Sequence, residues 1–242
     1  LRAGQISPLL LAGVVGFLYF AGRDRWFAAG ICAALITVKP HLLYLLGPSI
    51  LLYVVRYRRW SLLAGFIVAM AVATAVAWLP NPALLAQYLH AVSYYPPEEW
   101  ATPTLGGVLR LVLGVDRFWL QFLPSAAGVC WFCAYWWRKR TRWNWAQEMP
   151  LLVMVSVATA AYGWTFDHVV LLIAVIPAAA TLVRAKLSLW RLMLVLSYLA
   201  FTAIALFSSM DQIFYWWMAA WLLAWCLLVR SICAARTAEL GL

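Results

Sequence analysis

The chain has 242 residues, of which 67% are hydrophobic and only 11% are charged, and its mean hydropathy is +0.87. Soluble globular domains are roughly half apolar and about a quarter charged, so these proportions exclude that class as well as disordered and collagen-like chains. The net charge of +10 raises the question of nucleic acid. In so hydrophobic a chain, however, basic residues first indicate orientation in a membrane.

Apolar stretches that can cross a bilayer recur along the whole chain. A transmembrane helix needs about 20 apolar residues. The stretch 26–55 is longer and is interrupted by Lys39-Pro40-His41, so we interpret it as two short helices joined by a turn. A single helix would hold an unpaired lysine near the bilayer centre, at a cost of about 3 kcal/mol. The predicted spans are residues 6–21, 26–38, 42–55, 61–79, 118–137, 147–164, 168–184, 191–208 and 213–229.

The basic residues are distributed unevenly between the two ends of these spans. All but four of the 18 Lys and Arg residues fall at one end, and the exceptions are Arg2, Lys39, Arg110 and Arg117. Cytoplasmic loops are enriched in Lys and Arg. We therefore expect nine spans in the cytoplasmic membrane, with residue 1 outside and residue 242 in the cytoplasm. Nucleic acid is not expected as a partner, and the odd number of spans predicts a further span upstream of Leu1.

The longest loop, residues 80–117, is predicted on the outer face. Its first half has one apolar face at helical spacing, formed by Leu84, Leu85, Tyr88, Leu89 and Val92. This pattern predicts a helix that lies in the plane of the lipid headgroups. An aromatic and acidic tip follows, in which the pair Glu98 and Glu99 is most simply a solvated turn. Thr104 is then expected to cap a short helix that ends at Leu113.

Polar residues at the outer face are the candidates for function. Lys39 and His41 share the turn between two short helices. A lysine suits a phosphate oxygen and a histidine can donate to one, whereas a snorkelling lysine and a structurally satisfied histidine are the alternative. Asp167 and His168 form a candidate acid–base pair. The alternative is that Asp167 is the N-terminal cap of the helix 168–184, and the two roles are compatible. Gln5 is either a ligand or an interfacial amide.

Other patterns are interpreted as structural. Cys130 and Cys133 have the spacing of a metal or redox motif, but they lie within an apolar span and have no second pair. We therefore expect no metal site and no bound cofactor. The sequence has no Walker loop, dinucleotide-binding glycine motif or Gly-x-Ser-x-Gly elbow, so nucleotide chemistry in the cytoplasm is not expected.

Several short motifs, in their order along the chain, resemble membrane glycosyltransferase family 87. They are Gly4-Gln5-Ile6-Ser7-Pro8, Ala29-Gly30, Val38-Lys39-Pro40, Arg58-Arg59-Trp60 and Trp164-Thr165-Phe166-Asp167-His168 with the following helix as far as Pro177. The resemblance implies a GT-C fold, which is an all-α integral membrane protein with a polytopic helical bundle. It also implies transfer of a mannose- or arabinose-like sugar from a polyprenyl-phosphate donor to a lipid or glycan acceptor, outside the cytoplasmic membrane.

The resemblance also implies roles for the outer-face residues. Lys39 and His41 are expected to hold the donor phosphate, with Arg110 as a further candidate, and Gln5 to bind sugar or phosphate. In GT-C enzymes the catalytic aspartate typically lies in the first external loop. We therefore expect that aspartate upstream of Leu1.

The remaining roles concern the sugar. His168 is expected to contact phosphate or sugar, and Asp167 to orient His168 or bind sugar hydroxyls, which makes them the catalytic pair. The aromatic rings of Tyr94, Tyr95 and Trp100 are expected to cover the sugar. The alternative functions are a polytopic transporter, for which broken helices are typical although no repeat is visible, and a lipid flippase.

Overall fold

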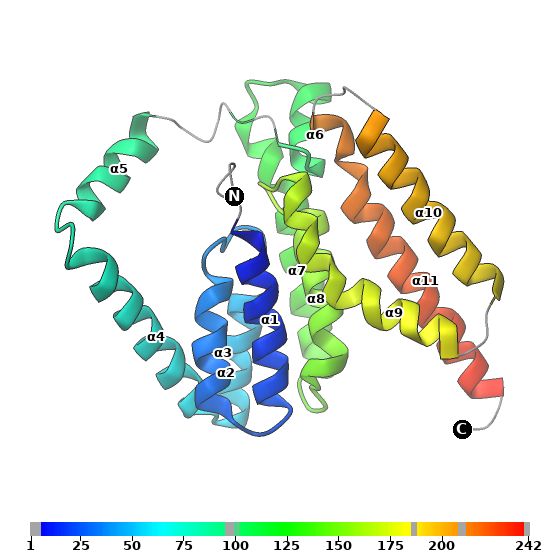
Figure 1. Ribbon diagram of the computed structural model, residues 1–242, viewed down its shortest axis with the longest axis horizontal. Helices are drawn as coiled ribbons and strands as arrows, with labels where there is room; N and C mark the ends of the chain where they lie inside the picture. Colours follow the sequence, from blue (N-terminus) through cyan, green and yellow to red (C-terminus); the bar gives the residue numbers. More distant parts are fainter. Residues whose placement is uncertain (1–5, 95–99, 101, 185–187, 208–211, 240–242) are drawn as a thin grey trace.

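The computed structural model describes the backbone of residues 6–94, 100, 102–184, 188–207 and 212–239, and within these residues it contains helices and no strand. The predicted all-α class is therefore confirmed. Helices α1 to α4 run alternately down and up, α5 continues upward from α4, and α7 to α11 again alternate in direction (Figure 1). Their bounds are α1 Ser7–Ala21, α2 Trp26–Ile36, α3 Leu46–Tyr57, α4 Trp60–Trp78, α5 Leu84–Tyr94, α6 Leu105–Leu113, η2 Phe118–Phe122, α7 Leu123–Lys139, α8 Trp145–Thr159, η3 Thr165–Leu171, α9 Leu172–Arg184, α10 Ser188–Phe207, η4 Gln212–Tyr215 and α11 Trp217–Glu239.

Part of the helical surface is suited to lipid. Among the described residues, three stretches are long and apolar enough to cross a membrane, namely Trp60–Trp78, Thr165–Arg184 and Ile213–Ile232. The side chains of Ile67, Val72 and Val76 on α4 are 55%, 57% and 65% exposed. Water-soluble monomers seldom expose apolar surface of this extent. The number of nine spans stays a prediction.

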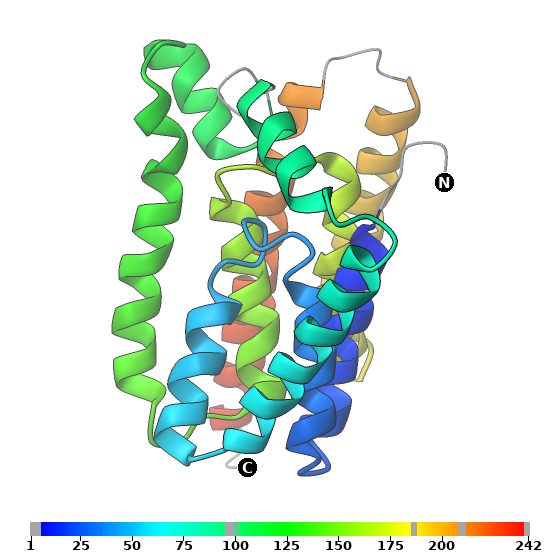
Figure 2. The same ribbon diagram turned by 90° about the vertical axis from the view of Figure 1, so that its left-hand side faces the viewer.

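The turns gather at two ends of different character. The turns 22–25, 58–59 and 140–144 lie together at one end, and all of them carry arginine (Figure 1 and Figure 2). We call this the basic end. The turn 37–45 and the segment 160–164 lie together at the opposite end, with α6 beside them. We call this the site end, because it brings the predicted site residues of several helices together.

Helix α8 forms the centre of the bundle. Its side chains Met149, Leu152, Val153 and Met154 are fully buried, and α8 contacts α7, α9 and α11. A helix that is apolar on all sides is expected to be surrounded by other helices. Because α8 ends at Thr159, its position fixes where the segment 160–164 enters the site end.

The turn between α2 and α3 is longer than the predicted tripeptide. Helix α2 ends at Ile36 and α3 begins at Leu46, whereas the predicted spans were 26–38 and 42–55. Leu42, Leu43 and Leu45 in this turn are all buried. Their apolar side chains anchor an irregular segment in the core, and hydropathy does not distinguish such a segment from a helix. At α6 the prediction is confirmed, since the Gly107 N–H donates to the Thr104 hydroxyl over 3.1 Å.

Two glycines let α2 and α4 pack backbone against backbone. A Cβ on Gly30 would lie 2.0 Å from the carbonyl oxygen of Leu62, and one on Gly65 would lie 2.0 Å from that of Phe27. In lipid, helix association depends on such close contacts of small residues. The crossing fixes α2, and with it the turn 37–45 that follows.

We expect Gly30→Ala to force these helices apart and to destabilise the protein by about 1–3 kcal/mol, as overpacking does. Gly47→Ala in α3 is the matched control, because nothing lies within 4 Å of a Cβ at that position. It is expected to gain up to about 1 kcal/mol of helix propensity. Unfolding in detergent by increasing SDS, followed by circular dichroism, measures both. Equal stability of the two variants would contradict the close crossing.

Candidate functional site

Lys39 and Asp167, which are 128 positions apart in the sequence, form an ion pair at the site end. Lys39 Nζ lies 2.6 Å from Asp167 Oδ1, and the two side chains are 15% and 1% exposed. Lys39 comes from the turn 37–45 and Asp167 from η3. A buried carboxylate requires such compensation of its charge. The pair therefore ties the turn after α2 to the start of the α9 segment.

Further hydrogen bonds fix the Asp167 carboxylate. The Ser7 hydroxyl at the start of α1 donates a short hydrogen bond to Oδ1, and the Trp164 backbone N–H donates to Oδ2 over 3.0 Å. Lys39 Nζ also lies 3.3 Å from Ser7 Oγ. With both carboxylate oxygens held, Asp167 is a rigid anchor for Lys39.

The predicted N-cap role of Asp167 is wrong. Trp164 occupies the N-cap position of η3, and Asp167 is the third residue of that helix. Its carboxylate reaches back to the Trp164 N–H, as the acidic residue of a capping box does. The helical segment begins at Thr165, three positions before the predicted start. Its first part is the 3-10 helix η3, and α9 continues it from Leu172.

The Lys39 side chain is not completely buried. Its ammonium nitrogen lies 4.9 Å from the centre of the Phe166 ring. An ammonium has three N–H donors, of which Asp167 and Ser7 account for two. Lys39 is therefore held by two polar partners and packs against an aromatic ring.

His41 and Trp100 meet at the ring of Tyr162. The ring centres of His41 and Tyr162 are 6.3 Å apart, and those of Trp100 and Tyr162 are 6.0 Å apart. The protein around His41 lowers the pKa of its imidazole by burial, while Asp167 acts to raise it and Lys39 to lower it. His41 is therefore neutral at pH 7, so one ring nitrogen donates and the other accepts.

His168 has an unsatisfied nitrogen. Within the described residues, its buried Nδ1 has no hydrogen-bond partner. The neighbouring Asp167 carboxylate is bonded to Lys39, Ser7 and the Trp164 backbone. Buried polar atoms are almost always paired. His168 therefore carries a hydrogen-bonding nitrogen that the described residues leave unsatisfied.

Arg110 belongs to a second polar cluster at the site end. Its Nη1 donates to Gln121 Oε1 over 2.6 Å and its Nη2 to the Val115 carbonyl over 3.0 Å. Gln121 in turn donates to the Ala161 carbonyl over 2.8 Å. Arg110 is 8% exposed. These bonds hold the segment 160–164, which leads into η3 and Asp167.

The other predicted site residues lie differently. Tyr94 ends α5, is 70% exposed and stacks on His90 with ring centres 6.1 Å apart. Gln5, Tyr95, Glu98 and Glu99 lie outside the described residues. Among the residues that are described, no three His, Cys, Asp or Glu side chains gather as metal ligands would.

An apolar cavity borders the turn 37–45. It has a volume of about 320 Å³ and lies between α2, α3 and α4. Thr37, Pro40 and Tyr44 line it on the side of the turn, and Val54 and Leu62 line it further along the helices. Ligand pockets have volumes of about 300–1,000 Å³. The site end therefore combines a held cation with an adjoining apolar space.

Sequence reasoning missed four residues of this site. Ser7 and Phe166 lie inside the motifs that were singled out, and their position beside Gln5 and Asp167 was the available signal. Tyr162 and Gln121 lie in apolar surroundings where one sequence offers no indication of function. Both act through contacts with residues that are distant in the chain.

Comparison with known proteins gives a family match. The model of glycosyltransferase family 87 matches residues 1–161. This part contains the turn 37–45, the apolar cavity and the Arg110 cluster, and it ends before Asp167. No curated protein and no solved structure gives a significant match to the chain.

Proposed function

This chain belongs to glycosyltransferase family 87, and from that membership we propose that it transfers a sugar from a polyprenyl-phosphate donor to a lipid or glycan acceptor. The sugar is mannose- or arabinose-like, the enzyme is of the GT-C type, and transfer takes place at the outer face of the cytoplasmic membrane. The observation that carries the proposal is Lys39, a positioned and partly accessible cation on the turn that borders the apolar cavity.

A polyprenyl-phosphate donor joins a charged phosphate directly to a long apolar chain. Lys39 offers a compact cation to the phosphate oxygens. The cavity between α2, α3 and α4 offers about 320 Å³ of mainly apolar space to the first part of the chain. Both features lie within residues 33–66, so one short part of the fold meets both requirements of such a donor.

In the proposed reaction, the acceptor hydroxyl oxygen bonds to the anomeric carbon while the bond from that carbon to the phosphate oxygen breaks. The phosphate leaves with the electron pair, and the hydroxyl proton passes to a base. Lys39 stabilises the negative charge that grows on the phosphate, since a preorganised cation needs no reorientation. Asp167 positions Lys39, and the free Nδ1 of His168 and the neutral ring of His41 contact the sugar or take up the proton.

The sugar itself is expected beside the aromatic rings. Trp100 already packs against Tyr162, and its ring is the described candidate for stacking on the sugar. Tyr94, Tyr95 and Gln5 complete the proposed sugar and phosphate contacts.

Sugar transfer in proteoliposomes tests this function. The product of the complete coding sequence that contains the chain is supplied with radiolabelled mannose or arabinose on polyprenyl phosphate, and with GDP-mannose as the nucleotide-linked comparison. We expect label to move from a lipid-linked donor to an extract of membrane lipids and glycans. The variant Arg56→Gln, which removes a charge at the basic end, is expected to keep the activity. Transfer from GDP-mannose alone would contradict the proposed donor class.

A further inference from the structure

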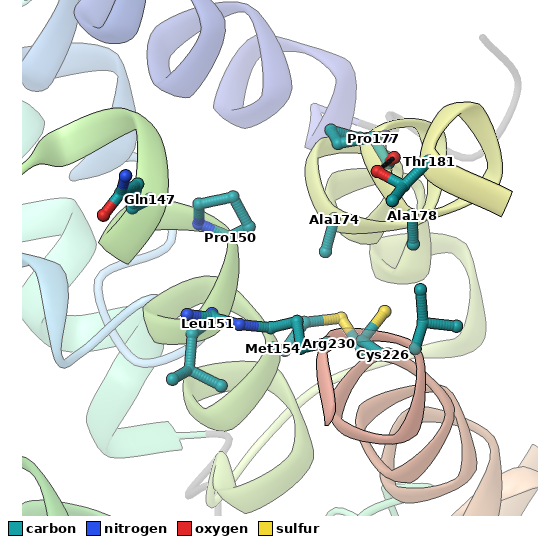
Figure 3. Close-up of a pocket in the computed structure, with 11 residues that line it drawn as sticks. Gln147, Pro150, Leu151, Met154, Ala174, Pro177, Ala178, Thr181, Cys226 and Arg230 are labelled. Carbon is teal, nitrogen blue, oxygen red and sulfur yellow. Dashed lines mark hydrogen bonds between the residues drawn. The ribbon is translucent and has the colours of Figure 1, made fainter. Parts of the chain in front are cut away.

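A second cavity, with a volume of about 350 Å³, lies between α8, α9 and α11 (Figure 3). Its lining includes Leu151 and Met154 from α8, Ala174 and Ala178 from α9, and Val229 from α11. No residue of this lining belongs to the apolar cavity between α2, α3 and α4, and Gln147 and Arg230 lie at its side nearer the basic end. The cavity is therefore distinct from the one at the site end.

The sequence explains why these helices leave space. Pro150 lies inside α8 and Pro177 inside α9, and both line the cavity. A proline inside a helix removes one backbone hydrogen bond and displaces the preceding turn. The methyl side chains of Ala174 and Ala178 fill little of the resulting gap. Two prolines and two alanines on the neighbouring helices α8 and α9 thus account for the cavity.

One wall of the cavity is cationic. Arg230 extends from α11 towards α8 (Figure 3) and is exposed, and it interacts with the Tyr135 hydroxyl. That hydroxyl donates to the carboxylate of the buried Glu148. Glu148 Oε1 also lies 3.8 Å from Lys139 Nζ, with which it forms an ion pair. Among the described residues no ion pair between Arg230 and a carboxylate is present, so the positive charge of Arg230 remains at the cavity. A guanidinium has five N–H donors, so Arg230 can bind an anion while it contacts Tyr135.

The surface around the cavity is suited to lipid. Ile176 and Val183 on α9, and Leu227 and Leu228 on α11, are all exposed apolar side chains. A ligand of this region is therefore expected to arrive from the bilayer rather than from water. Basic pockets between transmembrane helices on the cytoplasmic side commonly hold anionic headgroups.

We propose that this cavity binds an anionic phospholipid from the leaflet at the basic end. The phosphate pairs with Arg230 and accepts a hydrogen bond from the Gln147 amide, which also lines the cavity. The upper part of one acyl chain packs against Leu151, Met154 and Ala178. The positive charge of Arg230 selects an anionic over a zwitterionic headgroup, and the apolar walls select a lipid over a free phosphate.

Native mass spectrometry of the delipidated full chain in detergent tests this site. Phosphatidylglycerol and phosphatidylcholine with identical acyl chains are titrated separately. We expect the Kd of phosphatidylglycerol to be about tenfold lower than that of phosphatidylcholine. One charge-assisted hydrogen bond in a partly desolvated site changes a Kd by about this factor. Arg230→Gln is expected to abolish the preference, whereas the matched variant Arg56→Gln, at the same end but on α3, is expected to keep it.

Two further measurements distinguish binding in this cavity from a non-specific attraction of anionic lipids to the basic end. Ala178→Phe is expected to fill the cavity and to weaken binding of both lipids, with an unchanged helical circular dichroism spectrum. Glycerol phosphate, which has the headgroup charge but no acyl chain, is expected not to compete. An unchanged preference in Arg230→Gln, an equal loss in Arg56→Gln, competition by glycerol phosphate or undiminished binding by Ala178→Phe would each overturn the proposal. If Arg230→Gln fails to fold, the Ala178→Phe and glycerol phosphate results decide.

Discussion

Asp167→Asn is expected to destabilise the protein by about 3–5 kcal/mol, because it leaves the Lys39 ammonium in a largely buried site without a compensating charge. Asparagine has nearly the shape of aspartate and keeps an oxygen for the Trp164 N–H. The loss therefore reports the charge rather than the space. Since Lys39 retains some exposure, we expect a value near the lower end of the range. Unfolding by SDS in detergent, followed by circular dichroism, gives the free energy of unfolding.

Asp24→Asn is the matched control for this measurement. Asp24 pairs with Arg59 at 3.4 Å, but both side chains are well exposed, and exposed ion pairs contribute about 0–1 kcal/mol. Asparagine also tolerates the positive φ of 56° at Asp24. If Asp167→Asn cost no more than this control, the ion pair would not be what anchors the turn 37–45.

The placement of Lys39 and Asp167 at one end of the fold was accessible from the sequence, whereas their contact was not. Each apolar span reverses the direction of the chain, so hydropathy places residues near span ends at one end or the other. Hydropathy does not say which helices are neighbours. In a membrane protein, the side chains that face lipid and those that face the core are both apolar. The periodic pattern that reveals packing in a soluble helix is therefore weak.

Arg110 shows the same limit at a single residue. Arg110 lies in the predicted external loop, and the family resemblance made it a further candidate for the donor phosphate. In the structure it is buried and bonded to Gln121 and Val115. Its partner Gln121 lies in an apolar region of the sequence. A local sequence signal predicts structure better when it depends on neighbouring residues alone. The capping of α6 by Thr104 is such a case.

A variant without either charge of the ion pair distinguishes an effect on the free energy of unfolding from an effect on the rate of sugar transfer. The double variant Lys39→Met/Asp167→Asn has no uncompensated charge, so we expect it to recover most of the free energy of unfolding that Asp167→Asn loses. Its rate of sugar transfer is nevertheless expected to fall about 10²–10³-fold, the loss typical when one preorganised group that stabilises growing negative charge is removed. Initial rates in proteoliposomes and SDS unfolding are measured on the same preparation.

The comparison among the variants identifies what Lys39 does. A double variant that is stable and inactive shows that the Lys39–Asp167 pair is needed for the reaction, because the fold is intact in the same sample. Lys39→Arg keeps the positive charge but replaces a compact ammonium by a planar guanidinium, so we expect it to retain part of the rate. A stable double variant that transfers sugar at the wild-type rate would reject Lys39 as the phosphate-binding group, and the ion pair would then serve only to hold the turn 37–45 against η3.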